Sequence, residues 1–431
     1  MTSDSQPPDN DRKKARSAMF IVFFVVLIDL LGFGIVLPLL PRISEQLLTT
    51  AAVATQWHGL IIGGVLSVFS LMQFLVAPLW GQVSDRIGRR PVLLIGLVGS
   101  VVFYILFGVA CTLIATKPQL ALILMFVSRF GAGIAGATIS TAQAVIADCT
   151  PKEKRSHGMA MIGIAFGVGF TIGPIIAGVA LAIMPNNLEL TGYFAAGLSF
   201  IALLMGLRML PETRKFGNHS ARRGWIDTKG MFNTLKTPTV GLLVLIFFLA
   251  TFGFAKFEST LALLTGDFGY DIRDNFWIFA YVGFVLMLTQ GLLYRRMVKK
   301  LFEVRMMQLG LVFMFVGLLF LATVAVWQAA PARQLLFFVA LAVGVVGFAF
   351  LTPSVQALIS IRSDPNRQGE VLGVNQAFSA LARILGPVVG IVLFKAHSSH
   401  ILPYVAAGLL MLPVFAMLPK IKRTPAEKAA S

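Results

Sequence analysis

Charged residues are scarce in this sequence. Only 13% of its 431 residues are Asp, Glu, Lys or Arg, whereas a soluble globular protein has about 25%. Hydrophobic residues make up 57% of the chain, and its mean hydropathy is +0.83. This composition leaves too few polar side chains to cover a soluble protein, and it therefore excludes a water-soluble enzyme or nucleic-acid-binding protein.

The sequence also lacks the patterns of cofactor and metal sites. The chain has two cysteines, Cys111 and Cys149, which cannot form a disulfide framework, and no Cys/His spacing resembles a zinc site. It has no Walker A lysine motif, which argues against transport driven by ATP. We therefore expect no metal, no cofactor and no enzymatic activity.

Long apolar runs take the place of these features. A helix needs about 20 apolar residues to cross the roughly 30 Å hydrocarbon layer of a membrane. Scanning the chain gives twelve such runs, six before a polar stretch at residues 211–238 and six after it. The first run has no cleavage site and is expected to stay as an uncleaved helix. The runs lie near residues 18–40, 57–80, 91–115, 120–147, 158–183, 190–210, 239–264, 275–297, 305–327, 334–359, 369–394 and 401–419.

Basic residues are distributed unevenly between the loops. A net charge of +17 can indicate nucleic-acid binding, since 36 Lys and Arg stand against 19 Asp and Glu. With the N-terminus inside, however, 28 of these cations fall in inner segments and only five in outer loops. This is the positive-inside pattern. We therefore expect a multi-pass protein of the cell (inner or plasma) membrane with both termini in the cytoplasm and no nucleic-acid partner.

The two sets of six runs share features at a nearly constant offset. The segment GQVSDR at 81–86 aligns with GLLYRR at 291–296, and the Gly-Pro pair at 173–174 aligns with that at 386–387. Parallel repeats of this kind place a substrate site at their interface, near the bilayer midplane. We expect an N-terminal tail at 1–17, six-helix bundles at 18–210 and 239–419, a cytoplasmic linker at 211–238 and a C-terminal tail at 420–431.

The most specific local signal is GQVSDRIGRR, between the second and third runs. A glycine allows close helix approach, and an aspartate in a short basic loop can pair with arginines or face a helix N-terminus. Such a loop can act as a conformational latch, although a topogenic basic turn is the simpler alternative. The segment resembles the loop signature of the major facilitator superfamily. The matching residues are Gly81, Asp85, Arg86, Gly88, Arg89 and Arg90.

The fourth run contains Arg129 within SRFGAGIAG. An arginine inside a membrane is costly, and it usually faces the bundle interior and finds a partner. In the superfamily's proton antiporters a similar R-x-x-x-G segment contributes to proton coupling. Arg129 and Gly133 match it, although Ala132 stands where the family usually has glutamine. A purely structural arginine, bonded to nearby carbonyls, is the alternative.

The fifth run is rich in glycine and contains a kink-forming proline. It resembles the antiporter signature G-x-x-x-G-P-x-x-G-G through Gly169, Gly173, Pro174 and Gly178, with Ala177 in place of the first closing glycine. In the family this signature marks drug:proton antiporters. Small residues at this spacing are also common in ordinary membrane-helix packing, so both readings stay open.

The first run places Asp29 in mid-helix, ahead of two glycines and an L-P-x-L-P ending. This segment resembles the tetracycline-efflux-like group of these antiporters. Burial in an apolar cavity disfavours the charged carboxylate, and a cation such as Arg129 favours it. A carboxylate balanced between these effects can take up and release protons. A capping or packing aspartate is the alternative.

The second half has its own charged residues within predicted spans. Lys256 and Glu258 lie two apart on the seventh run, so they point in different directions. Glu258 is a second candidate for proton transfer and, with Asp29, for binding a substrate cation. Arg383, on the eleventh run, can pair with Glu258 or bind an anionic substrate. Gln143 and Gln376 are further candidate substrate contacts.

Together the resemblances cover nearly the whole chain. They imply an all-α polytopic membrane protein with twelve helices in two pseudo-symmetric bundles, surrounded by lipid and working as a monomer. Its function would be proton-coupled antiport of hydrophobic or amphipathic organic compounds. The alternative is a carrier of organic anions or lipid-like metabolites, working by symport or exchange, with Arg383, Lys256 and Arg129 as binding charges. A receptor or scaffold that transports nothing is disfavoured, because intramembrane charges cost stability.

Overall fold

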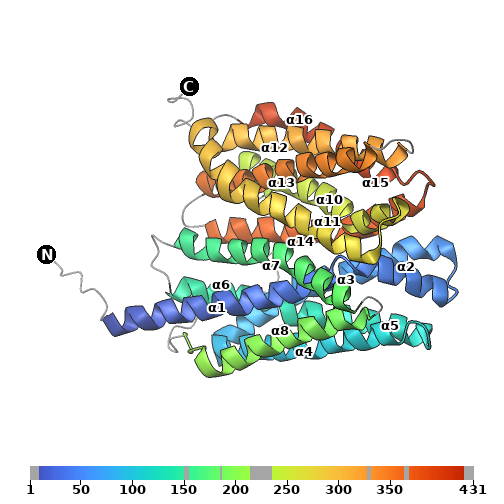
Figure 1. The fold of residues 1–431 in the computed structure, drawn as a ribbon. Helices are drawn as coiled ribbons and strands as arrows, with labels where there is room; N and C mark the ends of the chain where they lie inside the picture. The colour runs from blue at the N-terminus through green and yellow to red at the C-terminus, as the bar shows by residue number, and fades with distance from the viewer. Residues whose placement is uncertain are drawn as a thin grey trace. The chain divides into compact units, whose positions relative to one another are not determined.

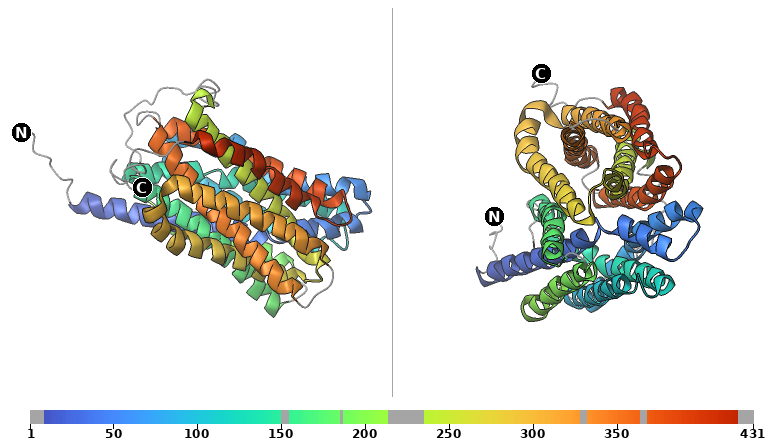
Figure 2. Two further views of the ribbon diagram at one scale, coloured as in Figure 1. Left: turned by 90° about the horizontal axis from the view of Figure 1, so that it is seen from above. Right: turned by 45° about the vertical axis from the view of Figure 1, so that its right-hand side comes forward.

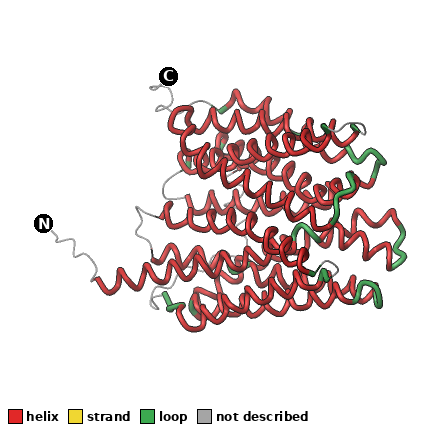
Figure 3. The backbone as a smooth tube through the Cα atoms, in the orientation of Figure 1, coloured by secondary structure: helices red, strands yellow, loops and turns green. Residues whose placement is uncertain are grey.

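The computed structural model describes residues 9–149, 155–184, 187–213, 235–327, 332–363 and 368–421. Within these ranges the regular secondary structure is helical, and no strand occurs among the described residues (Figure 3). The predicted all-α fold class is therefore confirmed.

The described residues of the first half of the chain form eight α-helices (Figure 1). They are α1 (Asp9–Val36), α2 (Leu40–Thr50), α3 (His58–Ile87), α4 (Arg89–Thr112), α5 (Pro118–Gly136), α6 (Ile139–Cys149), α7 (Arg155–Ile183) and α8 (Glu189–Met209), with a 3₁₀ turn η1 (Thr55–Trp57) before α3.

The second half contains seven described α-helices and two shorter helical turns. They are α10 (Pro238–Asp267), α11 (Ile272–Leu288), a π-helical turn η3 (Thr289–Tyr294), α12 (Arg295–Val326), α13 (Arg333–Arg362), α14 (Gln368–Lys395), α15 (Leu402–Leu409), α16 (Met411–Met417) and a 3₁₀ turn η4 (Leu418–Lys420).

Ten segments of the described chain are long and apolar enough to cross a membrane. One of them, Ile272–Val326, has 55 residues, which as a straight helix would extend about 80 Å, far beyond a single crossing. It includes α11 and α12, and α12 itself is broken at Phe302 (φ 59°, ψ 169°). Helix α7 adds a shorter apolar segment, Gly167–Ile183. The count of twelve spans stays a prediction.

Two predicted spans are interrupted. The run at 18–40 ends as a helix at Val36, and α2 starts at Leu40 after a turn that contains Pro38. The run at 120–147 is divided into α5 and α6 by residues 137–138. Hydropathy does not register these breaks, because a hydropathy window averages over the two or three residues of each break.

The chain forms two compact units. Unit 1 comprises Met1–Leu37 and Met72–Trp225, and unit 2 comprises Pro38–Leu71 and Ile226–Ser431. Helix α3 therefore begins in unit 2 and ends in unit 1. These units describe how the helices pack in this structure. The expected bundles at 18–210 and 239–419 stay a prediction.

Long helix pairs make up each unit. In unit 1, α1 packs against α7 and α8, and α4 packs against α5 and α8. In unit 2, α12 packs along α13, and α10 along α14. Helices α12 and α13, which are gold and orange in Figure 2, run side by side.

The core of unit 1 is an apolar cluster from five helices. Val22 of α1, Leu97 of α4, Val145 of α6, Ala165 of α7 and Ala202 of α8 are all almost completely buried within it. Because α1 meets all four partner helices here, the cluster fixes the position of the helix that carries Asp29.

Large apolar side chains also cover the outside of the helices. Phe20, Ile123 and Ile183 are exposed by 59%, 59% and 73%. A soluble protein rarely leaves so many large apolar groups in water. Apolar exteriors on helices that satisfy their own backbone hydrogen bonds are typical of chains surrounded by lipid.

Candidate functional site

Arg129 lies in the interior of unit 1. Its side chain, on α5, has 0% of its surface exposed. The guanidinium carbon lies 5.8 Å from the ring centre of Tyr104 and 5.5 Å from that of Phe107, both on α4. Aromatic faces attract a desolvated cation with a free energy of about 2 kcal/mol. The arginine is therefore held among packed helices, away from the lipid-facing surface.

Tyr104 also contacts the first helix. A Cβ atom added to Gly32 of α1 would lie 2.9 Å from Tyr104 Cε2. The ring beside Arg129 thus also contacts α1, at Gly32. Asp29 stands three residues before Gly32 on the same helix, and its side chain lies outside the described residues.

The glycines of the fifth predicted span make a close contact with α1. A Cβ atom on Gly34 would lie 2.5 Å from the carbonyl oxygen of Gly169, and one on Gly173 would lie 2.8 Å from Gly34 Cα. Only glycine permits two backbones to approach this closely. Pro174 lies inside α7, and Gly178 is buried. The predicted antiporter motif therefore makes a packing interface, and its role in antiport stays a prediction.

The loop between α3 and α4 is closed by an acidic residue from another segment. Gly88 has φ 106° and ψ 161°, a conformation open essentially to glycine alone. The Glu212 carboxylate, just beyond α8, accepts hydrogen bonds from the backbone N–H groups of Arg89 (2.9 Å) and Arg90 (3.1 Å). This carboxylate caps the positive end of α4.

The arginines of this loop bind neighbouring helices within unit 1. Arg89 donates to Ser84 Oγ at 2.6 Å, and Arg90 donates to the carbonyl oxygen of Leu207 at 2.7 Å. Arg86 is exposed, and the side chain of Asp85 lies outside the described residues. No described atom lies within 4 Å of a Cβ built on Gly81. The close helix approach expected there is therefore not made by the described residues, and the role of Gly81 stays a prediction.

Lys256 is buried where α10 meets α14 in unit 2. It is exposed by only 1%, and its Nζ lies 4.7 Å from the ring centre of Phe252. A Cβ atom on Gly390 would lie 3.0 Å from Lys256 Cα, and one on Gly386 would lie 2.6 Å from Ala255 Cβ. The repeated Gly-Pro segment of the second half therefore also makes a close helix contact.

Glu258 and Arg383 interact electrostatically across the same pair of helices. Glu258 is half-buried, whereas Lys256, two residues earlier, is fully buried, so the two side chains do point in different directions. Arg383 is exposed and donates from Nη1 to Ser379 Oγ at 2.8 Å. Gln376 is exposed, and the side chain of Gln143 lies outside the described residues.

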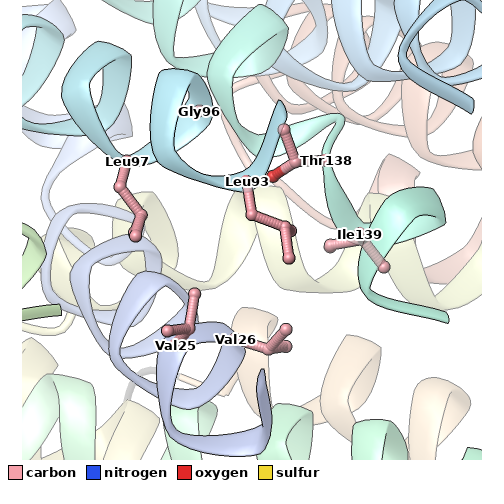
Figure 4. Close-up of a pocket in the computed structure, with 7 residues that line it drawn as sticks. All are labelled: Val25, Val26, Leu93, Gly96, Leu97, Thr138 and Ile139. Atoms are coloured by element: carbon pink, nitrogen blue, oxygen red, sulfur yellow. The ribbon is translucent and has the colours of Figure 1, made fainter. Parts of the chain in front are cut away.

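A small cavity lies in unit 1, and none of the side chains that line it is charged (Figure 4). Its volume of about 10 Å³ suffices for about one water molecule and not for an organic substrate. Within the described residues, no group of three or more His, Cys, Asp or Glu side chains could hold a metal ion. The cavity is lined by Val25, Val26, Leu93, Gly96, Leu97, Thr138 and Ile139.

Sequence reasoning missed several polar contacts. Glu212 follows a helix at the start of the polar stretch and belongs to no motif, and Tyr104 is one of many aromatic residues in apolar runs.

Arg42 also joins residues 38–71 to the rest of unit 2, a contact that the sequence did not indicate. Arg42 donates to the carbonyl oxygens of Ala262 (2.9 Å) and Tyr270 (2.5 Å). Only packing brings such distant residues together.

Comparison with known proteins agrees with this architecture. The sequence matches the Major Facilitator Superfamily over residues 22–387 and 296–431. It is 31% identical to the class E tetracycline resistance protein of Escherichia coli over 384 residues, which cover 88% of each chain.

Solved structures share the fold. The crystal structure of the human organic anion transporter MFSD10 (TETRAN) superposes with a TM-score of 0.65 at 27% identity, covering 96% of this chain and 100% of that one. A D-xylose–proton symporter superposes with a TM-score of 0.75 at 17% identity, covering 94% and 98%. The chain belongs to the major facilitator superfamily: it is a multi-pass membrane transporter of small molecules, with tetracycline-efflux proteins among its relatives, and not an enzyme.

Proposed function

We propose that this transporter exports a hydrophobic or amphipathic organic compound in exchange for protons. The observation that carries the proposal is the complete burial of Arg129 beside Tyr104, whose ring also contacts α1. A buried guanidinium in a membrane protein is costly, and such residues usually take part in substrate or proton transport. The similarity to a tetracycline resistance protein supports efflux as the function that Arg129 serves.

Asp29 is the proton carrier in this proposal. Arg129 favours the ionised carboxylate and the apolar surroundings favour the protonated one. Proton uptake by Asp29 would release Arg129 to change partners, and substrate would bind the state that the proton vacates. Glu258, paired with Arg383, is the matching candidate in the second half.

Alternating access would complete the cycle. We propose that the bundles at 18–210 and 239–419 rock about a central site, with the loop at Gly81–Arg90 as the latch on the cytoplasmic side. The close contact of α1 with α7 supports coupled movement of these two helices. We also propose that both termini lie in the cytoplasm and that the transporter acts as a monomer in the inner or plasma membrane.

Transport by the purified protein in liposomes tests the proposal. A pH gradient should drive substrate uptake in the wild type, and Asp29→Asn should abolish gradient-driven exchange while leaving substrate counterflow. Asp271→Asn is the matched control, because Asp271 is exposed outside the spans and Asn also caps helices. Gradient-driven exchange that persists in Asp29→Asn would refute the mechanism.

A second candidate function is the carriage of organic anions. Three described cations, Arg129, Lys256 and Arg383, lie well inside predicted spans and away from their ends. The human relative of known structure is an organic anion transporter. This candidate predicts saturable binding of anions but not of organic cations, lost in Arg383→Ala. The converse selectivity would leave drug efflux as the function.

A further inference from the structure

Helix α11 of unit 2 continues through η3 into a basic segment. The chain is helical without interruption from Ile272 to Leu301, and Phe302 ends this helix with φ 59° and ψ 169°. A helix of this length extends about 45 Å, whereas the hydrocarbon layer of a membrane is about 30 Å thick. Because the helix starts directly after the polar capping residue Asp271, its last turns at 295–301 reach beyond the hydrocarbon into the headgroup region.

Four cations share one face of this segment, within about 140° of the helix surface at about 100° per residue. All four side chains are exposed. The opposite face is apolar and half-buried, and it consists of Met297, Val298 and Leu301. The segment is therefore amphipathic. The four cations, which we call the basic face, are Arg295, Arg296, Lys299 and Lys300.

The charges of the basic face are not neutralised within the described part of the chain. Among the described residues, no ion pair or side-chain hydrogen bond reaches any of the four cations. Glu303, the nearest acid in the sequence, interacts with Tyr294 instead. The cations also stand in two pairs four residues apart, and like charges at this spacing destabilise a helix. An attractive partner for this face must therefore come from outside the chain.

The corresponding loop of the first half uses its cations differently. The repeat places Arg295 where the latch motif has Asp85, so the acid of the first loop is a cation in the second. In the first loop, Arg89 and Arg90 donate hydrogen bonds to residues of unit 1. The basic face makes no such bonds to described residues. The second copy of the loop thus has the charges of the first without its internal contacts, which indicates a different role.

Exposed leucines directly precede the basic face. Leu292 and Leu293 are exposed by 51% and 44%, and Arg296 follows them about one helical turn later. The helix surface is thus apolar at the edge of the hydrocarbon and cationic just beyond it. A phospholipid has the same order, with acyl chains followed by a phosphate. A soluble acidic protein or a free anion would contact the cations and leave the leucines uncovered, so the combination favours a lipid.

The sign of the charge selects the class of lipid. The distribution of loop charges predicts that this end of α11 faces the cytoplasm. Anionic phospholipids give the cytoplasmic leaflet a negative surface potential, and a cluster of four or more Lys and Arg beside a membrane helix attracts them. Each cation near the surface strengthens this attraction about fivefold. Guanidinium groups also bind phosphate oxygens in pairs, which suits Arg295 and Arg296.

We propose that the basic face binds the headgroup of an anionic phospholipid, with the acyl chains of that lipid against Leu292 and Leu293. The two arginines bind the phosphate, and the two lysines complete the neutralisation of the headgroup. The lipid is a bound partner of α11 and not a transported substrate. The site is separate from the charged residues proposed to bind protons and substrate, and it does not depend on the proposed antiport.

Equilibrium binding to the full-length protein in a neutral detergent tests the site. The probe is phosphatidylglycerol with a fluorescent acyl chain, and phosphatidylcholine with the same label measures binding without a net headgroup charge. The wild type should bind phosphatidylglycerol about thirtyfold more tightly or better, and added salt should reduce this preference. The measurement needs neither substrate nor pH gradient, so a failure of the proposed antiport would not affect it.

Variants of the basic face locate the binding. Lys299→Gln with Lys300→Gln should weaken phosphatidylglycerol binding about tenfold, and glutamine at all four positions should remove the preference. Lys299→Arg with Lys300→Arg keeps the charge and should keep the preference. The matched control also removes two exposed cations near helix ends, through Lys117→Gln with Arg273→Gln, and it should bind as the wild type does.

Three results would overturn the proposal. They are equal affinity of the wild type for the two lipids, a full preference in the fourfold variant, and displacement of the probe by inorganic phosphate or polyglutamate as effectively as by unlabelled phosphatidylglycerol. The last result would indicate a site for soluble anions. If the fourfold variant does not fold, Arg295→Gln with Arg296→Gln and Lys299→Gln with Lys300→Gln should each lose part of the preference.

Discussion

The carboxylate of Glu212 binds the backbone N–H group of Arg89, so a residue that follows α8 caps the N-terminus of α4. This bond joins the basic loop to a segment that the loop sequence does not indicate. It also explains why position 88 requires glycine, since a Cβ atom there would collide with the same carboxylate.

Glu212→Ala should lower stability through loss of this cap. Two N–H groups at the positive end of α4 lose their acceptor, which costs about 1 kcal/mol. Glu212→Gln retains one oxygen and should have a smaller effect. Thermal unfolding of the purified protein in detergent measures both. An alanine variant as stable as the wild type would show that water replaces the cap.

Gly88→Ala and Gly81→Ala should differ sharply, although both lie in the same loop motif. Alanine at 88 would have to adopt φ 106° against the Glu212 carboxylate, a strain of about 1–3 kcal/mol. Alanine at 81 meets no described atom within 4 Å, so the unfolding free energy should change by less than about 0.5 kcal/mol. Loss of transport in a stable Gly81→Ala protein would indicate a close approach in another conformation.

Gly34→Ala should disturb the contact between α1 and α7. Its Cβ would lie 2.5 Å from the carbonyl oxygen of Gly169, and overpacking of this kind costs about 1–3 kcal/mol. Gly167→Ala, on the same helix as Gly169, has open space and should be tolerated. Melting temperatures and transport rates of the two variants provide the comparison. Equal behaviour would mean that the helices can separate at little cost.

Lys256→Met should keep or increase stability. The lysine is buried with its Nζ over Phe252, and methionine fills similar space without the cost of burying a charge. Lys117→Met, at an exposed position, is the control. If the protein carries organic anions, Lys256→Met should lower anion transport by about tenfold or more. Unchanged anion transport would remove Lys256 from the binding site.

Several features of the site could be predicted from the sequence because they depend on local composition. Arg129 stands out as a charge in an apolar run, and a charge within a membrane is expected to face the bundle interior and not the lipid. The opposite directions of Lys256 and Glu258 follow from helix geometry. The helix breaks at Pro38 and at residues 137–138 were not predicted, because a hydropathy window averages over them.

The sequence by itself determined that the chain is a helical membrane protein of the major facilitator superfamily, since hydropathy, loop charge and signature motifs are all properties of short segments. The tertiary structure alone decided which distant groups meet: the Glu45 side chain with that of Lys395, the Glu212 carboxylate with the backbone N–H of Arg89, and the ring of Tyr104 with both Arg129 and α1. These contacts join segments far apart in the chain. They depend on how helices pack, and no pattern within a single segment encodes that.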